Sequence, residues 1–166
     1  ASVDAVLLLG PLYHLTERDD RVRALSEAAR VVRPGGTVFA AAISRFASTL
    51  DGLRARYLED PAFAVAAAED RESGQHRNPT GDPAYFTTAY FHRPEELAHE
   101  LDAAGLTHEA TLAVEGVAWL LPDLDARLST DSQRAVLLDA LAALEAESAL
   151  LGASAHLLIV GRRPEL

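Results

Sequence analysis

The amino-acid sequence predicts an α/β fold, in which parallel strands of one sheet alternate with helices. Residues 3–9 form an apolar run that ends at Gly10-Pro11, and a second apolar run follows at 37–43. Continuous apolar runs of this length are typical of strands buried on both faces of a parallel sheet. Because the two runs flank a helical pattern, we expect a strand–helix–strand unit with a right-handed crossover.

The segment between these two strands carries the start and stop signals of a helix. Thr16 and Asp19 have the spacing of a capping box with an acid at the third helical position. Pro34 lacks an amide donor and Gly35-Gly36 can take positive φ, so we expect the helix to stop there in a tight turn. The expected apolar stripe consists of Val22, Leu25, Ala28, Ala29 and Val32.

The rest of the chain predicts further helices and two more strands, and the last two strands should be antiparallel because no simple crossover joins them. In the long C-terminal helical region we expect a buried face of leucines at 137, 138, 141 and 144. In order, the sequence predicts helix over 44–68 with a new start at Asp60-Pro61, a mobile loop over 69–83, an extended aromatic segment over 85–91, a helix from Pro94 to Gly105, a strand over 106–115, mostly helix over 117–151 and a strand over 154–161.

Composition excludes several classes of function. The net charge is −10, and all 15 basic residues are Arg, without the clusters that nucleic acid or an anionic membrane would need. No apolar run is long enough to span a membrane, so we expect a soluble, cytoplasmic protein. Cysteine is absent and none of the six His forms a metal-binding pair on a helix, so we expect no metal site.

Four segments, taken in order, resemble one known family. The stretches are Val3-Asp4-Ala5-Val6 through Gly10-Pro11-Leu12-Tyr13-His14-Leu15, Ala28 through the Pro34-Gly35-Gly36 turn to Val38, Tyr90 through Leu97 to Ala104-Gly105-Leu106, and Ala153 through Gly161-Arg162. Together they are similar to the C-terminal portion of class I (Rossmann-like) methyltransferases that use S-adenosylmethionine. The resemblance implies half of that family's sheet, with parallel strands, a final antiparallel strand and a helical insertion.

The family's Gly-rich loop and its ribose-binding acid have no counterpart in these 166 residues. Those elements hold the cofactor by close backbone approach and by a carboxylate on the ribose. We therefore expect residues 1–166 to form a single, N-terminally incomplete domain that is inactive by itself. Its first strand would present an unpaired edge. A strand from upstream sequence, or from a second copy in a homodimer, could pair with this edge.

The resemblance places the cofactor S-adenosylmethionine against the loop that follows the first strand. Leu9 and Gly10 would line it through backbone atoms, and Tyr13 could close over the cofactor or the acceptor. His14 is the candidate general base, because a neutral imidazole titrates near physiological pH. The alternatives stay open: Gly10-Pro11 could simply turn the chain, Tyr13 could be core, and His14 could satisfy backbone groups at a helix entry.

Residues 45–92 lie where the family inserts a lid over the methyl acceptor, and most of the chain's aromatic residues fall there. Tyr57, Tyr90 and, beyond the lid, Trp119 beside Glu115-Gly116 are the candidate acceptor contacts. Each could instead pack a core of its own. Among the other histidines we expect solvated side chains at 76, 99 and 108, and a buried one at 156.

Two functions follow from these observations. The first is methyl transfer from S-adenosylmethionine to a small-molecule acceptor, by this chain as part of a longer one. The second is a non-catalytic module with the same fold, which associates through its exposed first strand. Since the fold hosts many acceptors, the sequence does not specify which atom is methylated.

Overall fold

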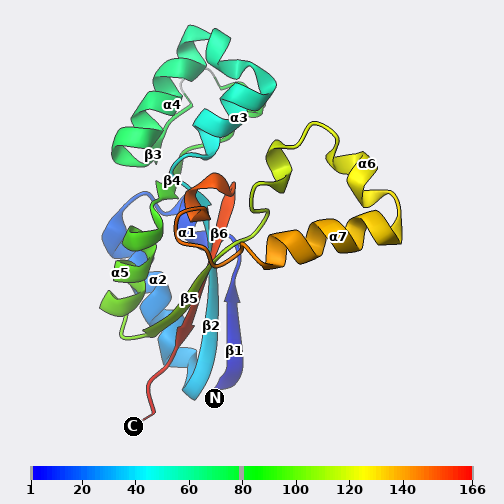
Figure 1. Cartoon of the computed structure of the whole chain (residues 1–166). Helices are drawn as coiled ribbons and strands as arrows, with labels where there is room; N and C mark the ends of the chain where they lie inside the picture. Colours follow the sequence, from blue (N-terminus) through cyan, green and yellow to red (C-terminus); the bar gives the residue numbers. More distant parts are fainter. Residues whose placement is uncertain (1, 79–80, 166) are drawn as a thin grey trace.

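The computed structural model describes residues 2–78 and 81–165 and has a mixed sheet at its centre (Figure 1). Strand order is β3-β4-β2-β6-β5, and β1 also pairs with β2. β1 and β4 are parallel to β2, whereas β5 and β6 are antiparallel to each other, so both predictions of strand direction are confirmed. The strands are β1 (Val3–Leu8), β2 (Val32–Ser44), β3 (Gln75–His76), β4 (Ala89–His92), β5 (Thr107–Ala113) and β6 (His156–Arg162).

Some helices cover one face of this sheet, others lie beyond one end of its strands, and a last pair projects from its other side (Figure 1). The predicted helix before Gly105 is confirmed, and so is the new helix start at Asp60-Pro61, where the Asp60 carboxylate accepts from the Ala62 amide at 2.8 Å. The helices are α1 (Pro11–His14), α2 (Arg18–Val31), α3 (Ala47–Ala55), α4 (Pro61–Ser73), α5 (Pro94–Ala103), α6 (Leu124–Leu128) and α7 (Asp131–Ala142), with short 3-10 turns η1 (Tyr57–Glu59), η2 (Pro83–Tyr85), η3 (Ala118–Leu120) and η4 (Leu151–Ala153).

The predicted capping box at the start of α2 is wrong. The helix begins at Arg18, and the hydroxyl of Thr16 donates to the Glu17 carboxylate at 3.4 Å instead of capping an amide. The physical reason lies one turn further on. The guanidinium of Arg21 donates to the carbonyls of Leu15 and Thr16 at 2.9 and 2.8 Å, which holds the entry segment in place without a capping side chain.

The predicted Pro-Gly-Gly turn is built into β2 as an irregularity instead of preceding the strand. Gly35 takes a φ of 71°, and the register between β1 and β2 shifts at this point. Gly36 is needed for close approach, since a Cβ there would lie 2.7 Å from the Asp4 carbonyl oxygen. The two strands can therefore pair across the turn.

The predicted loop over 69–83 is shorter than expected. α4 continues to Ser73 and ends at Gly74, which has a φ of 77°, and β3 follows at once. β3 pairs antiparallel with β4. This pairing satisfies backbone N–H and C=O groups that in a loop would be hydrogen-bonded to water. The part of the prediction that concerns Pro79 lies outside the described residues.

The main core lies between the sheet and the pair α2 and α5. Leu25, Leu97 and Leu101 of these helices are fully buried against the sheet. On the opposite face of β1, Leu7 is 66% exposed, and Leu9, directly after the strand, is 55% exposed. The prediction that the first strand is buried on both faces is therefore wrong, because only one face is covered. The expected open edge is present, since β1 pairs with β2 alone among the described strands.

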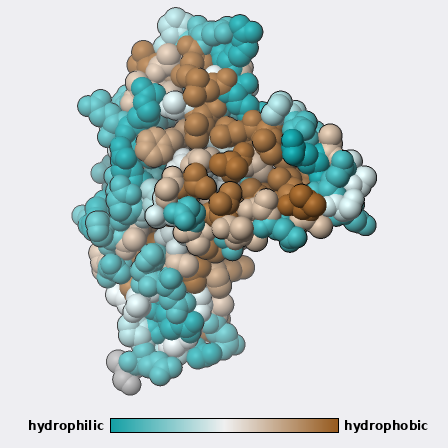
Figure 2. Space-filling view, in the orientation of Figure 1, coloured by the Kyte–Doolittle hydropathy of each residue, from teal (hydrophilic) through white to brown (hydrophobic). Residues whose placement is uncertain are grey.

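The predicted buried face of α7 is also wrong. None of its residues is buried, and Val136 and Leu138 are 72% and 52% exposed. The helix pairs with α6 in a hairpin that projects from the sheet, so its leucines meet no core (Figure 1). Apolar side chains gather on the face of the molecule between α3 and α7 (Figure 2). None of the described helices is long and apolar enough to cross a membrane.

Candidate functional site

A cavity of about 340 Å³ opens at the carboxyl ends of the parallel strands. Tyr13 follows β1, Ile43 ends β2, and Phe91 lies in β4; His156 begins the antiparallel β6 and so reaches the same edge. In open α/β sheets, ligands bind at this edge. We call it the strand-end cavity, lined by Tyr13, Ile43, Ala47, Ser48, Asp51, Phe63, His76, Tyr85, Phe86, Phe91, Trp119, Ala155 and His156.

Aromatic side chains form much of the wall of the strand-end cavity. Phe63 and Tyr85 pack edge to face at 5.0 Å, and Tyr57 supports both from behind at 5.4 and 5.9 Å. The indole of Trp119 donates to the Ala153 carbonyl at 2.8 Å, which fixes the ring at the rim. Of the predicted acceptor contacts, Trp119 lines the cavity and Tyr57 stands behind its wall. An apolar, aromatic lining suits an apolar ligand.

A first histidine of the cavity, His76, is held on both sides. Its Nδ1 lies 2.9 Å from Asp70, and Nε2 lies 2.7 Å from the Tyr85 carbonyl oxygen, which can only accept. Ser48 donates to the same Asp70 carboxylate at 2.6 Å. Burial would lower the pKa of His76, but the hydrogen bond and charge of Asp70 outweigh burial and raise it. The expected solvated side chain is therefore wrong: His76 is 2% exposed and is used as a donor at both nitrogens.

A second histidine, His156, is held at one nitrogen by the part of the chain that the structure describes. Its Nδ1 lies 2.6 Å from Glu115, whose other carboxylate oxygen accepts from the His156 amide at 2.9 Å and the Ser154 hydroxyl at 3.0 Å. Burial would raise the pKa of Glu115, but these hydrogen bonds lower it to about 2. The same bond to Glu115 raises the pKa of His156. The predicted buried histidine is wrong, because the His156 side chain is 43% exposed.

The loop after β1 brings its predicted residues to the same edge. The Tyr13 hydroxyl donates to the Leu9 carbonyl at 3.5 Å, and a Cβ on Gly10 would lie 3.5 Å from that hydroxyl. Tyr13 lines the strand-end cavity. His14 is exposed outside the lining, with its ring 4.8 Å from that of Tyr13 and 6.3 Å from that of Phe86.

Tyr90 lies away from the strand-end cavity, in a buried polar cluster. The Arg21 guanidinium sits 3.6 Å from the centre of its ring, and the Arg45 guanidinium donates to its hydroxyl at 3.1 Å. Burial is the main cause that raises the pKa of Tyr90. Arg21 also pairs with Glu100, which in turn contacts His92 at 3.2 Å. The structure therefore separates Tyr90 from the other predicted acceptor contacts.

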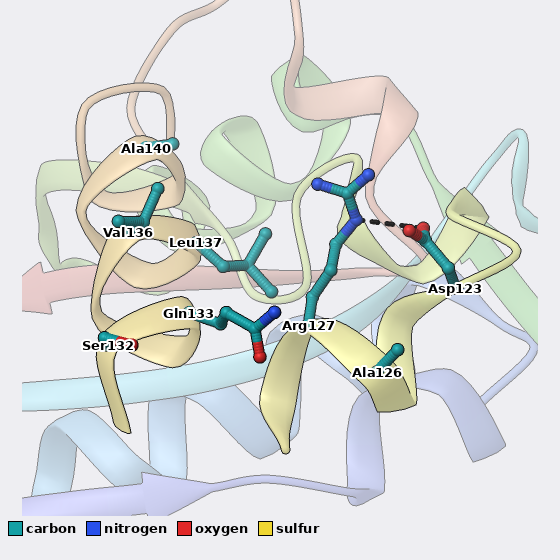
Figure 3. A pocket seen from close by; sticks show the side chains of 8 residues that line it. All are labelled: Asp123, Ala126, Arg127, Ser132, Gln133, Val136, Leu137 and Ala140. Carbon is teal, nitrogen blue, oxygen red and sulfur yellow. Dashed lines mark hydrogen bonds and ion pairs between the residues drawn. The ribbon is translucent and has the colours of Figure 1, made fainter. Parts of the chain in front are cut away.

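A larger hollow, of about 550 Å³, lies between α6 and α7, away from the strand ends (Figure 3). Its charged groups, Asp123 and Arg127, pair with each other at 2.9 Å. The rest of its lining is mostly small or apolar, with Val136 and Leu137 facing the hollow. Because the two charged groups of this hollow neutralise each other and the hollow lies away from the strand ends, the strand-end cavity is the better candidate.

Comparison with known proteins agrees with this geometry. Residues 1–40 match the sequence model of a family described as "Methyltransferase domain". A methyltransferase from Methanosarcina mazei, described as SAM-dependent, superposes with a TM-score of 0.54 at 19% identity, over 99% of this chain and 61% of that one. The fold is that of a class I methyltransferase. A second such methyltransferase, from Mesorhizobium loti, gives 0.52 at 13% identity, over 98% of this chain and 62% of that one.

The chain thus spans about three fifths of these methyltransferases. No curated protein sequence matches it significantly. Both of these methyltransferases are described as dependent on S-adenosylmethionine. In this chain Leu9 is exposed, and a Cβ at Gly10 would meet only the Tyr13 hydroxyl, at 3.5 Å. The Gly-rich loop of the methyltransferase fold is not among the described residues. Within the described parts of the chain, no three His, Asp or Glu side chains gather as metal ligands.

The sequence interpretation missed two pairs of titratable side chains that meet at the strand-end cavity. Asp70 and His76 are six residues apart across a helix end, and Glu115 and His156 are 41 apart. No local spacing marks the second pair. For the first pair, the Gly74 helix stop was a usable signal, since it turns the chain back so that His76 lies beside the last turn of α4.

Proposed function

We propose that this chain is the C-terminal portion of an S-adenosylmethionine-dependent methyltransferase that acts on a small, apolar acceptor. The observation that carries the proposal is the strand-end cavity, which opens at the carboxyl edge beside the loop over 9–14. That loop lies within the residues that match the methyltransferase domain. The aromatic wall supports an acceptor with an apolar or ring-shaped body.

In this proposal the residues divide between cofactor and acceptor. When bound, S-adenosylmethionine supplies an electrophilic methyl group. Leu9, Gly10 and Tyr13 would line its side of the cavity, while Trp119 would contact the acceptor and Tyr57 would support the wall. Residues 45–92 would act as a lid that excludes water from the acceptor. His14 stays a candidate base at the mouth, and Tyr90 would contribute only through the buried cluster.

The second candidate function is a non-catalytic module that associates through β1. The observation that favours it is the exposure of Leu7 in β1 and of Leu9 just after it, because β1 has β2 as its one partner among the described strands. A strand edge of this kind is a template for pairing with another chain. In this case a second copy, as in a homodimer, would cover β1.

Calorimetric titration with S-adenosylhomocysteine distinguishes the two functions. We would titrate this chain, and the same chain extended upstream by its reading frame. Saturable binding by the extended chain alone is the expected result, because the Gly-rich loop supplies most of the cofactor contacts. Absence of binding by both chains, with each shown to be folded by circular dichroism, would support the non-catalytic module.

The reverse result would also be informative. Tight, saturable binding by this chain alone would contradict the proposal that most of the cofactor site lies outside it. The Gly10→Val variant of the extended chain serves as the control for loss of binding. A branched side chain at this position would obstruct the backbone that the cofactor is proposed to contact, so this variant should bind S-adenosylhomocysteine more weakly.

A further inference from the structure

We propose that His156 is the general base of the strand-end cavity, and that the acceptor is a small phenol whose hydroxyl donates a hydrogen bond to its Nε2. The inference rests on the proposed function for the methyl transfer itself. The recognition of a phenol by His156 is a property of this chain alone and can be tested separately.

The hydrogen bonds around Glu115 determine which nitrogen of His156 is free. Glu115 is ionised near neutral pH, so Nδ1 must donate to it across the 2.6 Å contact. The other oxygen of Glu115 is occupied by the His156 amide and the Ser154 hydroxyl, so the carboxylate cannot rotate away. In the neutral imidazole the lone pair is therefore on Nε2.

The Nε2 atom is available to a ligand. It makes no hydrogen bond to any residue in 2–78 or 81–165, and the ring lines the strand-end cavity. His76, the other histidine of the lining, has no free nitrogen, because Asp70 and the Tyr85 carbonyl hold both. A carboxylate that orients an imidazole and leaves its far nitrogen open is the arrangement of a general base, and the half-buried Glu115 holds His156 in this way.

The charge in direct contact with His156 favours this role, because Glu115 is an anion. The titratable groups of the cavity lining itself are Tyr13, Asp51, His76 and Tyr85, and Asp70 holds the imidazole of His76. The Tyr85 hydroxyl donates to the Asp60 carboxylate at 2.7 Å, and this hydrogen bond raises the pKa of Tyr85 to about 12, so this phenol stays neutral. The bond to Glu115 strengthens His156 as a base, because it stabilises the imidazolium that forms.

The step balances with His156 alone as the base. The acceptor O–H proton moves to Nε2, and the oxygen lone pair forms the new O–CH₃ bond. The S–CH₃ bond breaks and leaves its electron pair on sulfur, so the products are a methyl ether, S-adenosylhomocysteine and an imidazolium held by Glu115. Bulk water then removes the proton from the exposed ring.

The lining indicates a phenol rather than a polar alcohol. Phe63, Phe91 and Ile43 present apolar surface, and the ring of Trp119 has its N–H satisfied by the Ala153 carbonyl. At about 340 Å³, the cavity is near the lower end of the range for small-molecule sites, which is roughly 300–1,000 Å³. A single substituted ring is the size class that this volume favours.

The test uses 4-nitrophenol, whose phenolate absorbs visible light. At a constant pH near the pKa of the phenol, adding this chain should increase the phenolate absorbance, because His156 takes the proton and the imidazolium stabilises the anion. His156→Asn keeps a donor for Glu115 but removes Nε2, and should abolish the increase. Glu115→Gln should reduce it. His108→Asn, at an exposed histidine on β5, is the matched control and should behave as wild type.

Unchanged absorbance with the wild-type chain would overturn the inference, and so would an equal increase with His156→Asn. Circular dichroism and urea unfolding of each variant separate loss of binding from loss of fold. If Glu115→Gln does not fold, the comparison of His156→Asn with His108→Asn still decides.

Activity of the upstream-extended protein separates this inference from the proposed function. With a phenol acceptor, His156→Asn should lower kcat about 10²–10⁴-fold. The rate should rise with pH through the pKa of His156. Glu115→Gln should shift this rise to lower pH, because it removes the hydrogen bond that raises the pKa of His156. Methyl transfer that is insensitive to His156→Asn would overturn the inference alone. A His156-dependent phenolate signal without methyl transfer would overturn the proposed function alone.

Discussion

Arg21 shows how one buried residue organises this fold. Its side chain is 2% exposed, and its guanidinium donates twice to Glu100, at 3.0 and 2.7 Å. It also donates to two carbonyls at the entry of α2 and lies over the Tyr90 ring. The helical pattern predicted an apolar stripe at this face of α2. The chain instead places a charge there, and the charge is stable only because all of these partners surround it.

At the scale of this residue, we predict that Arg21→Met lowers the free energy of unfolding by about 3–5 kcal/mol, because Glu100 is left buried without its partner. Urea unfolding followed by circular dichroism measures the change. Arg23→Met is the matched control two residues along the same helix; its side chain is 71% exposed and its ion pair with Asp20 should add little. Equal effects of the two substitutions would contradict this account of Arg21.

The β1–β2 pair depends on a close approach of backbone at Gly36. A Cβ at this position would lie 2.7 Å from the Asp4 carbonyl oxygen and 2.9 Å from that of Arg33, and neither backbone atom can move without disturbing the pair. The element thus depends on the absence of a side chain rather than on a contact. Gly10 is different, since a Cβ there would meet only the Tyr13 hydroxyl, at 3.5 Å.

At the scale of this element, we predict that Gly36→Ala destabilises the chain by about 1–3 kcal/mol through overpacking. At Gly10 the φ is −158°, outside the left-handed region, and an added Cβ would make only an ordinary contact. The unfolding midpoint of Gly10→Ala should therefore stay close to that of wild type. Thermal or urea unfolding of both variants tests the pair. A Gly36→Ala variant as stable as Gly10→Ala would show that β1 tolerates displacement.

The whole molecule has one covered and one open side. α2 and α5 bury one face of the sheet, whereas apolar residues of β1 and α7 face outward on other surfaces. Exposed apolar surface on an unpaired edge strand favours association. The structural relatives are longer than this chain, which agrees with an open side that further sequence could cover.

At the scale of the whole molecule, we predict that this chain self-associates with rising concentration. Sedimentation velocity measures the association. Leu7→Lys should weaken it, because a charge on β1 opposes edge pairing. Leu53→Lys, at a leucine of α3 with the same 66% exposure, should leave it unchanged. A chain that stays monomeric at all accessible concentrations would remove the support for the non-catalytic module.

The sequence by itself determined the strand–helix–strand unit, the helix starts at Asp60-Pro61 and Pro94, and the antiparallel final strands. These features follow from periodicity, from proline and glycine, and from chain order, which are local properties that the sequence states directly. Of the candidate site residues, Tyr13 and Trp119 line one cavity, whereas Tyr57 and Tyr90 lie outside its lining. The interpretation was wrong where contacts made by the folded chain replaced a local signal. The spacing of Thr16 and Asp19 predicted a capping box, but Arg21 holds the helix entry instead.

The tertiary structure alone decided which surfaces are buried and which titratable groups meet. α7 has the pattern of a packed helix, yet nothing among the described residues covers it, because burial depends on a neighbour and not on the helix itself. Glu115 and His156 meet across 41 residues, and Arg21 and Glu100 across 79. The strength of a base and the cost of a buried charge depend on such partners, and no pattern along the chain records the distance between them.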